Sequence, residues 1–208
     1  MAALATLLML PPGVAVAWLL ARRRFPGRSM LETLVSLPLV LPPVATGLIL
    51  LWVLGRRGPL GRLLAQTGLE MLFTWRAVVV AMAVMGLPLL VRAARAGFEQ
   101  VDRRYEQVAA TLGASPSRVF ITVSLPLAGR GVLAGALLGF SRALGEFGAT
   151  IMVAGALPGT RTIAIAIFGY TETGNQAAAV TMLSVSAAIA FGALFLSNRL
   201  TNHPAGAT

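Results

Sequence analysis

The chain has no cysteine and no lysine among its 208 residues. Without cysteine it can form no disulfide, hold no iron–sulfur cluster through thiolates and attach no c-type haem. Without lysine it cannot complete the G-x-x-x-x-G-K-[ST] loop that binds nucleotide phosphates. This chain therefore cannot itself be a P-loop ATPase.

Charged residues are also scarce, at 12% of the chain, which is about half the share usual in soluble domains. Apolar residues make up 57%. Stretches near the roughly 20 residues that cross a bilayer occur at 1–21, 33–54, 73–91, 127–152 and 176–198. The pattern predicts an all-α, polytopic transmembrane bundle of about five spanning helices. We expect one domain at residues 1–200, followed by a polar tail at 201–208.

Histidine occurs once, as His203 in the polar tail. A Ser–His catalytic pair, a histidine-ligated haem and a histidine metal site are thus excluded from the bundle, which argues against a membrane hydrolase. We expect no catalytic residue, no metal site and no enzymatic activity in this chain.

The net charge of +10 comes from arginines in short turns between apolar stretches, a distribution that argues against nucleic-acid binding. No basic residue precedes the first stretch and several follow it, so it is predicted to be an uncleaved span and not a signal peptide. The positive-inside rule makes the turn at 22–28 and the segment at 92–130 cytoplasmic, with the N-terminus outside and the C-terminus inside. The arginines left on or near the outer side are Arg56, Arg57, Arg62, Arg76 and Arg161.

The only sizeable polar region runs from about residue 96 to 126. Glu99–Leu112 can form a helix that Gly113 ends. Ser115 can cap a second helix with Pro116 at its first position. Two short helices joined by a glycine turn should therefore project from the bundle, while Gly55–Leu72 should form a turn and a short interfacial helix on the outer side.

The fourth stretch contains small and ionisable residues at helical spacing. Gly131, Gly135 and Gly139 share one helix face, where they permit close packing either within the chain or between two copies of it. Arg142 and Glu146 also share a face. Ionisable groups within a span usually line a cavity or pair with each other, so the two residues either switch partners near the inner mouth of a pathway or form a static pair.

The residues around Gly113 resemble the cytoplasmic coupling loop of ABC-importer permeases, which has the pattern E-A-A, three residues, Gly, nine residues, I-x-L-P. Nine residues follow Gly113 before Val123-Ser124-Leu125-Pro126, with Val in place of Ile. The E-A-A positions hold Gln107-Val108-Ala109, so the acidic residue is displaced to Glu106. A capped, partly apolar helix followed by a fixed turn can dock in a groove on a cytoplasmic partner.

Other segments are similar to one branch of that family. Ser141–Ile151 resembles the corresponding segment of molybdate and sulfate permeases, and Leu157–Thr162, Ala21–Ser29 and Leu37–Pro43 resemble the molybdate branch. Relatives usually carry more sequence before the first span, so we expect this chain to begin inside their longer N-terminal region.

The resemblance implies a type I ABC-importer permease for molybdate in the bacterial cytoplasmic (inner) membrane. Two copies would surround one pathway and work with a cytoplasmic ABC ATPase and an extracytoplasmic molybdate-binding protein. Tungstate, sulfate and thiosulfate are alternative cargoes, because all are tetrahedral dianions. A channel or a structural membrane subunit is a more distant alternative that would not need the docking loop.

A dianion in a narrow path needs small hydrogen-bond donors, and a permease should not hold it tightly. Candidate pathway residues, besides the two ionisable ones, are Thr46, Thr150, Thr160 and Thr162.

Overall fold

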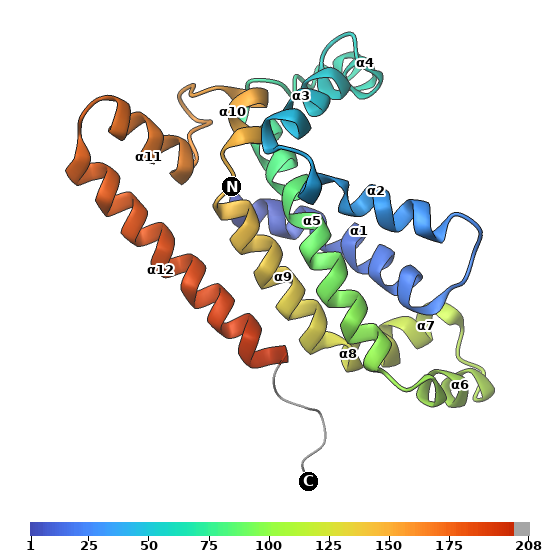
Figure 1. Cartoon of the computed structure of the whole chain (residues 1–208). Coiled ribbons are helices and arrows are strands. Elements are labelled where there is room, and N and C mark those ends of the chain that lie inside the picture. Colours follow the sequence, from blue (N-terminus) through green and yellow to red (C-terminus); the bar gives the residue numbers. More distant parts are fainter. Residues whose placement is uncertain (202–208) are drawn as a thin grey trace.

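The computed structural model describes residues 1–201, which form helices and contain no strand. Asn202 onward, with His203 and the rest of the predicted polar tail, lies outside the described residues. Three long helices form the centre of the molecule: α1 (Ala2–Arg22), α5 (Trp75–Gln100) and α9 (Gly129–Leu144). In Figure 1, α5 and α9 run alongside each other and α1 crosses behind α5. Helix α5 carries most of the core, because its buried residues extend from Ala77 to Phe98.

Small residues let these three helices approach closely. Gly131 and Gly135 of α9 lie against the backbone of α5, and Gly139 lies against Gly86 of α5 and the side chain of Met9 of α1. Of the two arrangements that the sequence left open for these glycines, the structure therefore has the packing within one chain.

The bundle has two ends, and each can be defined by the helix termini that meet there. Arg22 at the end of α1 bonds to the carbonyl of Val101 just after α5, and Thr201 at the end of α12 lines the same pocket as Val101 and Tyr105. We call this the loop end. At the opposite end Ala2 of α1 belongs to the same apolar cluster as Val153.

The second predicted span, 33–54, is not one helix. It is divided between α2 (Arg28–Val40) and α3 (Pro43–Leu54), whose axes differ by 117°. Pro42 and Pro43 cause the break, because proline has no N–H to donate and pushes the preceding residue into an extended conformation. Leu41 indeed has an extended backbone.

The fourth predicted span, 127–152, is also interrupted. Helix α9 ends at Leu144 and a short helix, α10 (Gly148–Ala154), follows after a break. Before α9, the run Pro116–Leu127 meets it at 73°. Within the described residues, three helices are long and apolar enough to cross a membrane, or up to five spans exist if each bent pair is one span.

The last two helices stand beside the bundle (Figure 1). Helix α12 (Gln176–Thr201) lies along α9, where the Ser197 hydroxyl donates to the Ala134 carbonyl at 3.1 Å. Most of its apolar side chains are exposed, so they must face lipid or another chain. Helix α11 (Ile163–Glu172) was not predicted; its ten apolar-rich residues are too few for a span.

The expected short helix in Gly55–Leu72 is α4 (Pro59–Gln66), at the end opposite to the loop (Figure 1). Pro59 occupies its first turn, where a missing N–H removes no hydrogen bond. Leu60 and Leu63 of this helix are exposed, as an interfacial position requires.

Candidate functional site

The predicted coupling loop forms two short helices at the loop end, α6 (Arg103–Thr111) and α7 (Pro116–Val119). The Ser115 hydroxyl accepts a hydrogen bond from the Arg118 N–H, as its capping position predicts. Gly113 has φ +85°, the left-handed conformation in which glycine ends a helix at little cost. The turn at Gly113 and the cap of the second loop helix at Ser115 therefore have the predicted geometry.

The start of the first loop helix was predicted wrongly. Glu99 and Gln100 complete α5, the chain turns at Val101, and α6 begins after Asp102. The Asp102 carboxylate accepts the Arg104 N–H at 2.9 Å and so caps α6. The Asp102 side chain bonds to the backbone as the cap of a new helix, and this arrangement competes with the continuation of α5 through residue 102.

One face of the loop is apolar and uncovered. Tyr105, Val108 and Leu112 are 61%, 58% and 83% exposed, and their spacing puts them on the same side of α6. Gln107 is exposed and Ala109 half-buried. An unburied apolar stripe on a capped helix is suited to a groove on another protein.

The second half of the loop leads into α9 without an extended residue. After α7 come a π-helical stretch, η1 (Phe120–Ser124), and the turn α8 (Leu125–Leu127). Val123 lies in η1, and Leu125 and Pro126 in α8. Single π-helical turns are rare and often occur at functional sites. A displacement of α7 would thus pass along hydrogen-bonded turns to α9.

Glu106 is the residue on which the parts of the loop converge. Its Oε1 accepts hydrogen bonds from Arg22 Nε of α1 at 3.0 Å and from the Ser124 hydroxyl at 2.7 Å. Arg22 also donates from Nη2 to the Val101 carbonyl at 2.9 Å. The side chains of Arg22 and Glu106 are 7% and 19% exposed, so this ion pair is largely shielded from water.

Arg142 and Glu146 form an ion pair at the break between α9 and α10. Arg142 donates to Glu146 Oε2, and the backbone N–H of Ala149 donates to Oε1, both at 2.7 Å. Glu146 is 1% exposed, and its carboxylate satisfies a backbone N–H in the first turn of α10. Both of its oxygens are engaged, which favours the static pair of the two interpretations left open.

The pair lies at the end of α9 that is remote from the loop. Helix α9 starts at the loop end, and Arg142 is in its last turn, about 20 Å further along the helix axis. If the loop end is cytoplasmic, as the sequence predicts, the pair is not beside an inner mouth at that end.

The four candidate threonines are all buried, yet three have hydroxyls engaged in local bonds. Thr150 donates to the Phe147 carbonyl at 2.9 Å, Thr160 donates to the Leu157 carbonyl at 2.9 Å, and the Thr162 hydroxyl accepts the Ile165 N–H at the start of α11. The Thr46 hydroxyl is buried without a partner. Thr46 thus retains an unused donor in this conformation.

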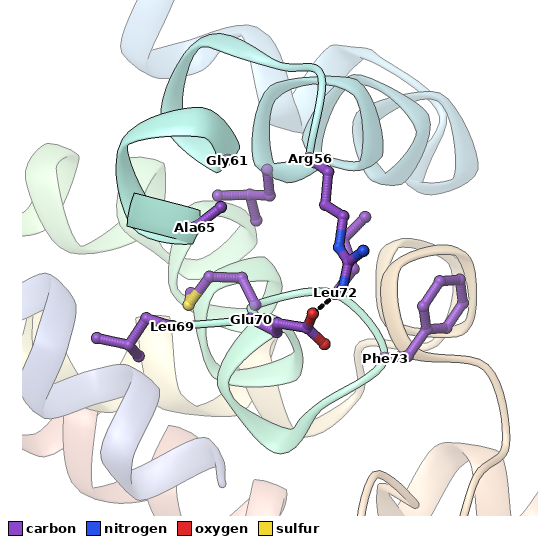
Figure 2. Close-up of a pocket in the computed structure, with 9 residues that line it drawn as sticks. Arg56, Gly61, Ala65, Leu69, Glu70, Leu72 and Phe73 are labelled. Carbon is purple, nitrogen blue, oxygen red and sulfur yellow. Dashed lines mark hydrogen bonds and ion pairs between the residues drawn. The ribbon is translucent and has the colours of Figure 1, made fainter. Parts of the chain in front are cut away.

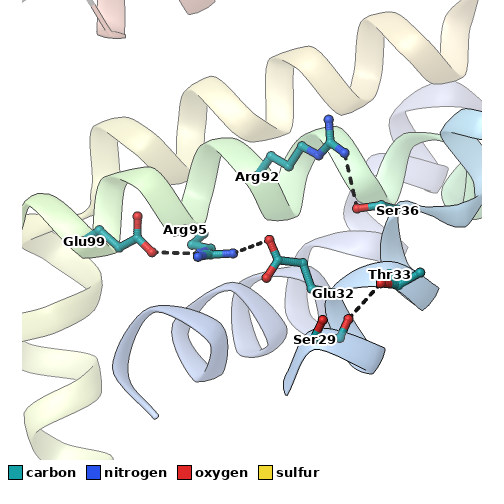
Figure 3. Close-up of polar contacts among 7 residues, drawn as sticks. All are labelled: Ser29, Glu32, Thr33, Ser36, Arg92, Arg95 and Glu99. Atoms are coloured by element: carbon teal, nitrogen blue, oxygen red, sulfur yellow. Dashed lines mark hydrogen bonds and ion pairs between the residues drawn. The ribbon is translucent and has the colours of Figure 1, made fainter. Parts of the chain in front are cut away.

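Sequence reasoning missed the partners of Glu106 and a polar network between α2 and α5 (Figure 3). Arg95 donates to Glu32 of α2 and to Glu99 of its own helix, both at 2.7 Å, and Arg92 reaches Ser36 at 3.4 Å. Helix α2 has no buried residue, so these contacts are its polar attachment to α5. The Arg95–Glu99 spacing was visible in the sequence, but the contact across 63 residues was not.

At the opposite end, a pocket of about 230 Å³ lies between α4 and the segment before α5 (Figure 2). Arg56 and Glu70 form an ion pair across it. Leu69, Leu72 and Phe73 line it as well. Within residues 1–201 no group of three or more His, Cys, Asp or Glu side chains could hold a metal ion.

Comparison with known proteins places this geometry in context. The family described as "Binding-protein-dependent transport system inner membrane component" matches residues 13–202. The molybdenum transport system permease protein ModB of Escherichia coli (strain K12) is 47% identical over 200 residues, which cover 95% of this chain and 87% of that protein. The sulfate transport system permease protein CysT of Salmonella typhimurium (strain LT2) is 38% identical over 189 residues, covering 90% of this chain and 68% of that protein.

Solved structures agree on the fold. A chain of the MetNI methionine ABC transporter in inward-facing conformations superposes with a TM-score of 0.70 at 19% identity, covering 96% of this chain and 89% of that one. The all-helical bundle described above is therefore the fold of an ABC-transporter membrane subunit.

Proposed function

The chain belongs to the family of binding-protein-dependent transport system inner membrane components, and from this premise we propose that it is the permease subunit of an ATP-driven molybdate importer. As a member of this family it is a multi-pass transport component of the inner membrane. It provides the path for the ion, and a separate ATPase provides the energy.

The observation that carries the proposal is the loop between α5 and α9. Its apolar stripe of Tyr105, Val108 and Leu112 is exposed on a helix whose two ends are both fixed, by Asp102 and by Gly113. A channel or a structural subunit would have no use for such a surface. A cytoplasmic ATPase that accepts the stripe in a groove could push on α9 through η1 and α8.

The proposed assembly contains two copies of this chain, two copies of an ATPase that binds ATP and Mg²⁺, and an extracytoplasmic molybdate-binding protein. The loop end faces the cytoplasm, which places the start of α1 outside and the end of α12 inside. The arginines that follow α1, Arg22, Arg23, Arg24 and Arg28, support this orientation because basic residues favour the cytoplasmic side. ATP binding and hydrolysis would shift the bundle between outward- and inward-open arrangements.

Molybdate is proposed over sulfate because ModB has the higher identity, 47% against 38% for CysT. Selectivity would lie mainly in the binding protein, since a permease that bound its cargo strongly would trap it. Thr46, with its unused hydroxyl, is the threonine we propose for contact with the passing ion. Thr150, Thr160 and Thr162 would instead shape the helix ends beside the path.

The test is uptake of radiolabelled molybdate by liposomes that contain this chain with its ATPase and binding protein. We expect uptake that requires ATP, persists in excess sulfate and is suppressed by tungstate. Suppression by sulfate would assign the chain to the sulfate branch. Uptake that continues without ATP would contradict the importer function altogether.

A further inference from the structure

The ion pair between Arg22 and Glu106 joins the loop to a helix that is remote from it in the sequence. We propose that this pair, Ser124 and an aromatic contact beside them form a junction that fixes the loop to α1. Helices α1 and α9 then move together when the ATPase displaces the loop. Glu106 is then a positioning residue that acts through Arg22, not a contact for the ATPase. The inference deepens the proposed function and rests on it.

The polar part of the junction connects four segments: α1, the turn after α5, α6 and η1. Arg22 donates to Glu106 at 3.0 Å and to the Val101 carbonyl at 2.9 Å, and the same Glu106 oxygen accepts from Ser124 at 2.7 Å. Ser124 is 1% exposed. One carboxylate oxygen thus bonds to the end of α1 and the end of η1, while Arg22 also bonds to the turn after α5.

The burial of the Arg22–Glu106 pair makes it costly to separate. An exposed ion pair contributes little because water replaces each partner easily. At 7% and 19% exposure, Arg22 and Glu106 cannot separate without leaving a largely buried charge unpaired. The junction therefore resists separation of α1 from the loop.

Aromatic packing reinforces the same junction. Phe120, the first residue of η1, has its ring 5.4 Å from that of Trp18 of α1, edge to face, and 6.2 Å from that of Phe98 of α5, stacked. Phe98 is fully buried. The base of the loop is thus held between α1 and α5 by rings as well as by charge.

From this junction α1 runs through the centre of the bundle. Ala17 and Leu20 are buried in the same apolar cluster as Val91 and Phe98, and Met9 packs against Gly86 of α5 and Gly139 of α9. A shift of the loop would therefore reach the opposite end by two routes, through the chain into α9 and through Arg22 into α1.

The first experiment compares Arg22→Gln and Glu106→Gln in the complete transporter in liposomes. Removing the pair should leave ATP hydrolysis running but lower molybdate uptake per ATP by about five- to tenfold, the lower range of typical coupling between sites. Arg23→Gln is the matched control, because Arg23 is exposed in the same turn. Unchanged uptake per ATP, or equal loss of ATPase activity and uptake, would overturn the inference, since equal loss indicates a contact with the ATPase.

Replacing the ion pair with a covalent link distinguishes a junction that stays rigid during the cycle from one whose residues switch partners. The chain has no native cysteine, so Arg22→Cys with Glu106→Cys provides a unique thiol pair. Linking the two with a short bifunctional thiol reagent should restore coupling. If α1 and the loop instead move past each other during the cycle, the same link will block uptake, and the proposal is wrong.

The junction can also be tested without transport. Spin labels on Arg24→Cys and Ala110→Cys, both at exposed positions, should give one narrow distance distribution that broadens when Arg22→Gln is added. A distribution that stays narrow would contradict the junction. If the unmodified transporter takes up no molybdate, the proposed function fails while this measurement still decides whether Arg22 holds the loop.

Discussion

Gly97 of α5 and Gly131 of α9 face each other so closely that a Cβ added to Gly131 would lie 2.6 Å from the Gly97 Cα. No real Cβ tolerates such a contact with a backbone atom, so the two helices can keep this approach only with glycine at both positions. The contact lies near the start of α9, where motion of the loop would enter the bundle.

Gly131→Ala should destabilise the purified permease by about 1 to 3 kcal/mol, the usual cost of forcing an extra carbon into a packed core. The measurement is thermal unfolding in detergent. Gly129→Ala is the matched control, because a Cβ at Gly129 meets nothing within 4 Å. Equal melting temperatures for the two variants would show that α5 and α9 do not approach as described.

Leu112→Ser should leave the stability of the isolated permease within about 0.5 kcal/mol, as for other exposed positions. It should reduce co-purification of the ATPase, because it removes the most exposed residue of the apolar stripe on α6. Leu112→Met, which keeps an apolar side chain of similar size, should retain the ATPase. Full retention by the serine variant would exclude the stripe as the docking surface.

Gly113→Pro should abolish ATP-driven uptake while membrane insertion persists. Proline fixes φ at about −65° and has no N–H. Gly113 has φ +85°, and its N–H donates to the Ala110 carbonyl at 3.0 Å. Gly113→Asn should keep most of the activity, since asparagine enters the left-handed region more readily than other residues. Normal uptake by the proline variant would refute the role given to this turn.

Glu146→Ala should lower the free energy of unfolding by about 3 to 5 kcal/mol, because it leaves Arg142 without its partner and removes the acceptor of the Ala149 N–H. Uptake should fall only in proportion to the amount of folded protein. Glu172→Ala, at an exposed position, should change neither quantity. Loss of uptake with unchanged stability would favour the interpretation of the pair as a gate that switches partners.

Short-range sequence signals for helix caps and turns predicted the geometry of the loop well. Gly113, Ser115 and Pro116 have the predicted geometry because a positive φ, an N-cap and a first-turn proline depend on neighbours within a few residues. Hydropathy located the spans but not their breaks, because Pro42 and Gly145 add little to a window average. The fold of the family was recognisable from the spacing of the loop motif.

Contacts between distant segments were not predictable. Arg22 stands in a run with Arg23 and Arg24, and nothing in the sequence distinguishes the one that Glu106 binds. The Glu146 carboxylate was paired correctly with Arg142, but its second bond depends on α9 ending before it. Helix α10 also packs on α3 through Gly47 and Gly148, a contact between distant segments that no local pattern records.

The central position of α1 has a consequence for biosynthesis. Its buried side chains pack against α5 and α9, which leave the ribosome much later than α1 does. Because segments of a chain appear in order during synthesis, α1 must wait in the bilayer for its partners. Its small-residue face of Ala5, Gly13 and Ala17 can meet lipid in the meantime without exposing charge. The core is then complete only after α9 has been synthesised and has joined α1 and α5 in the bilayer.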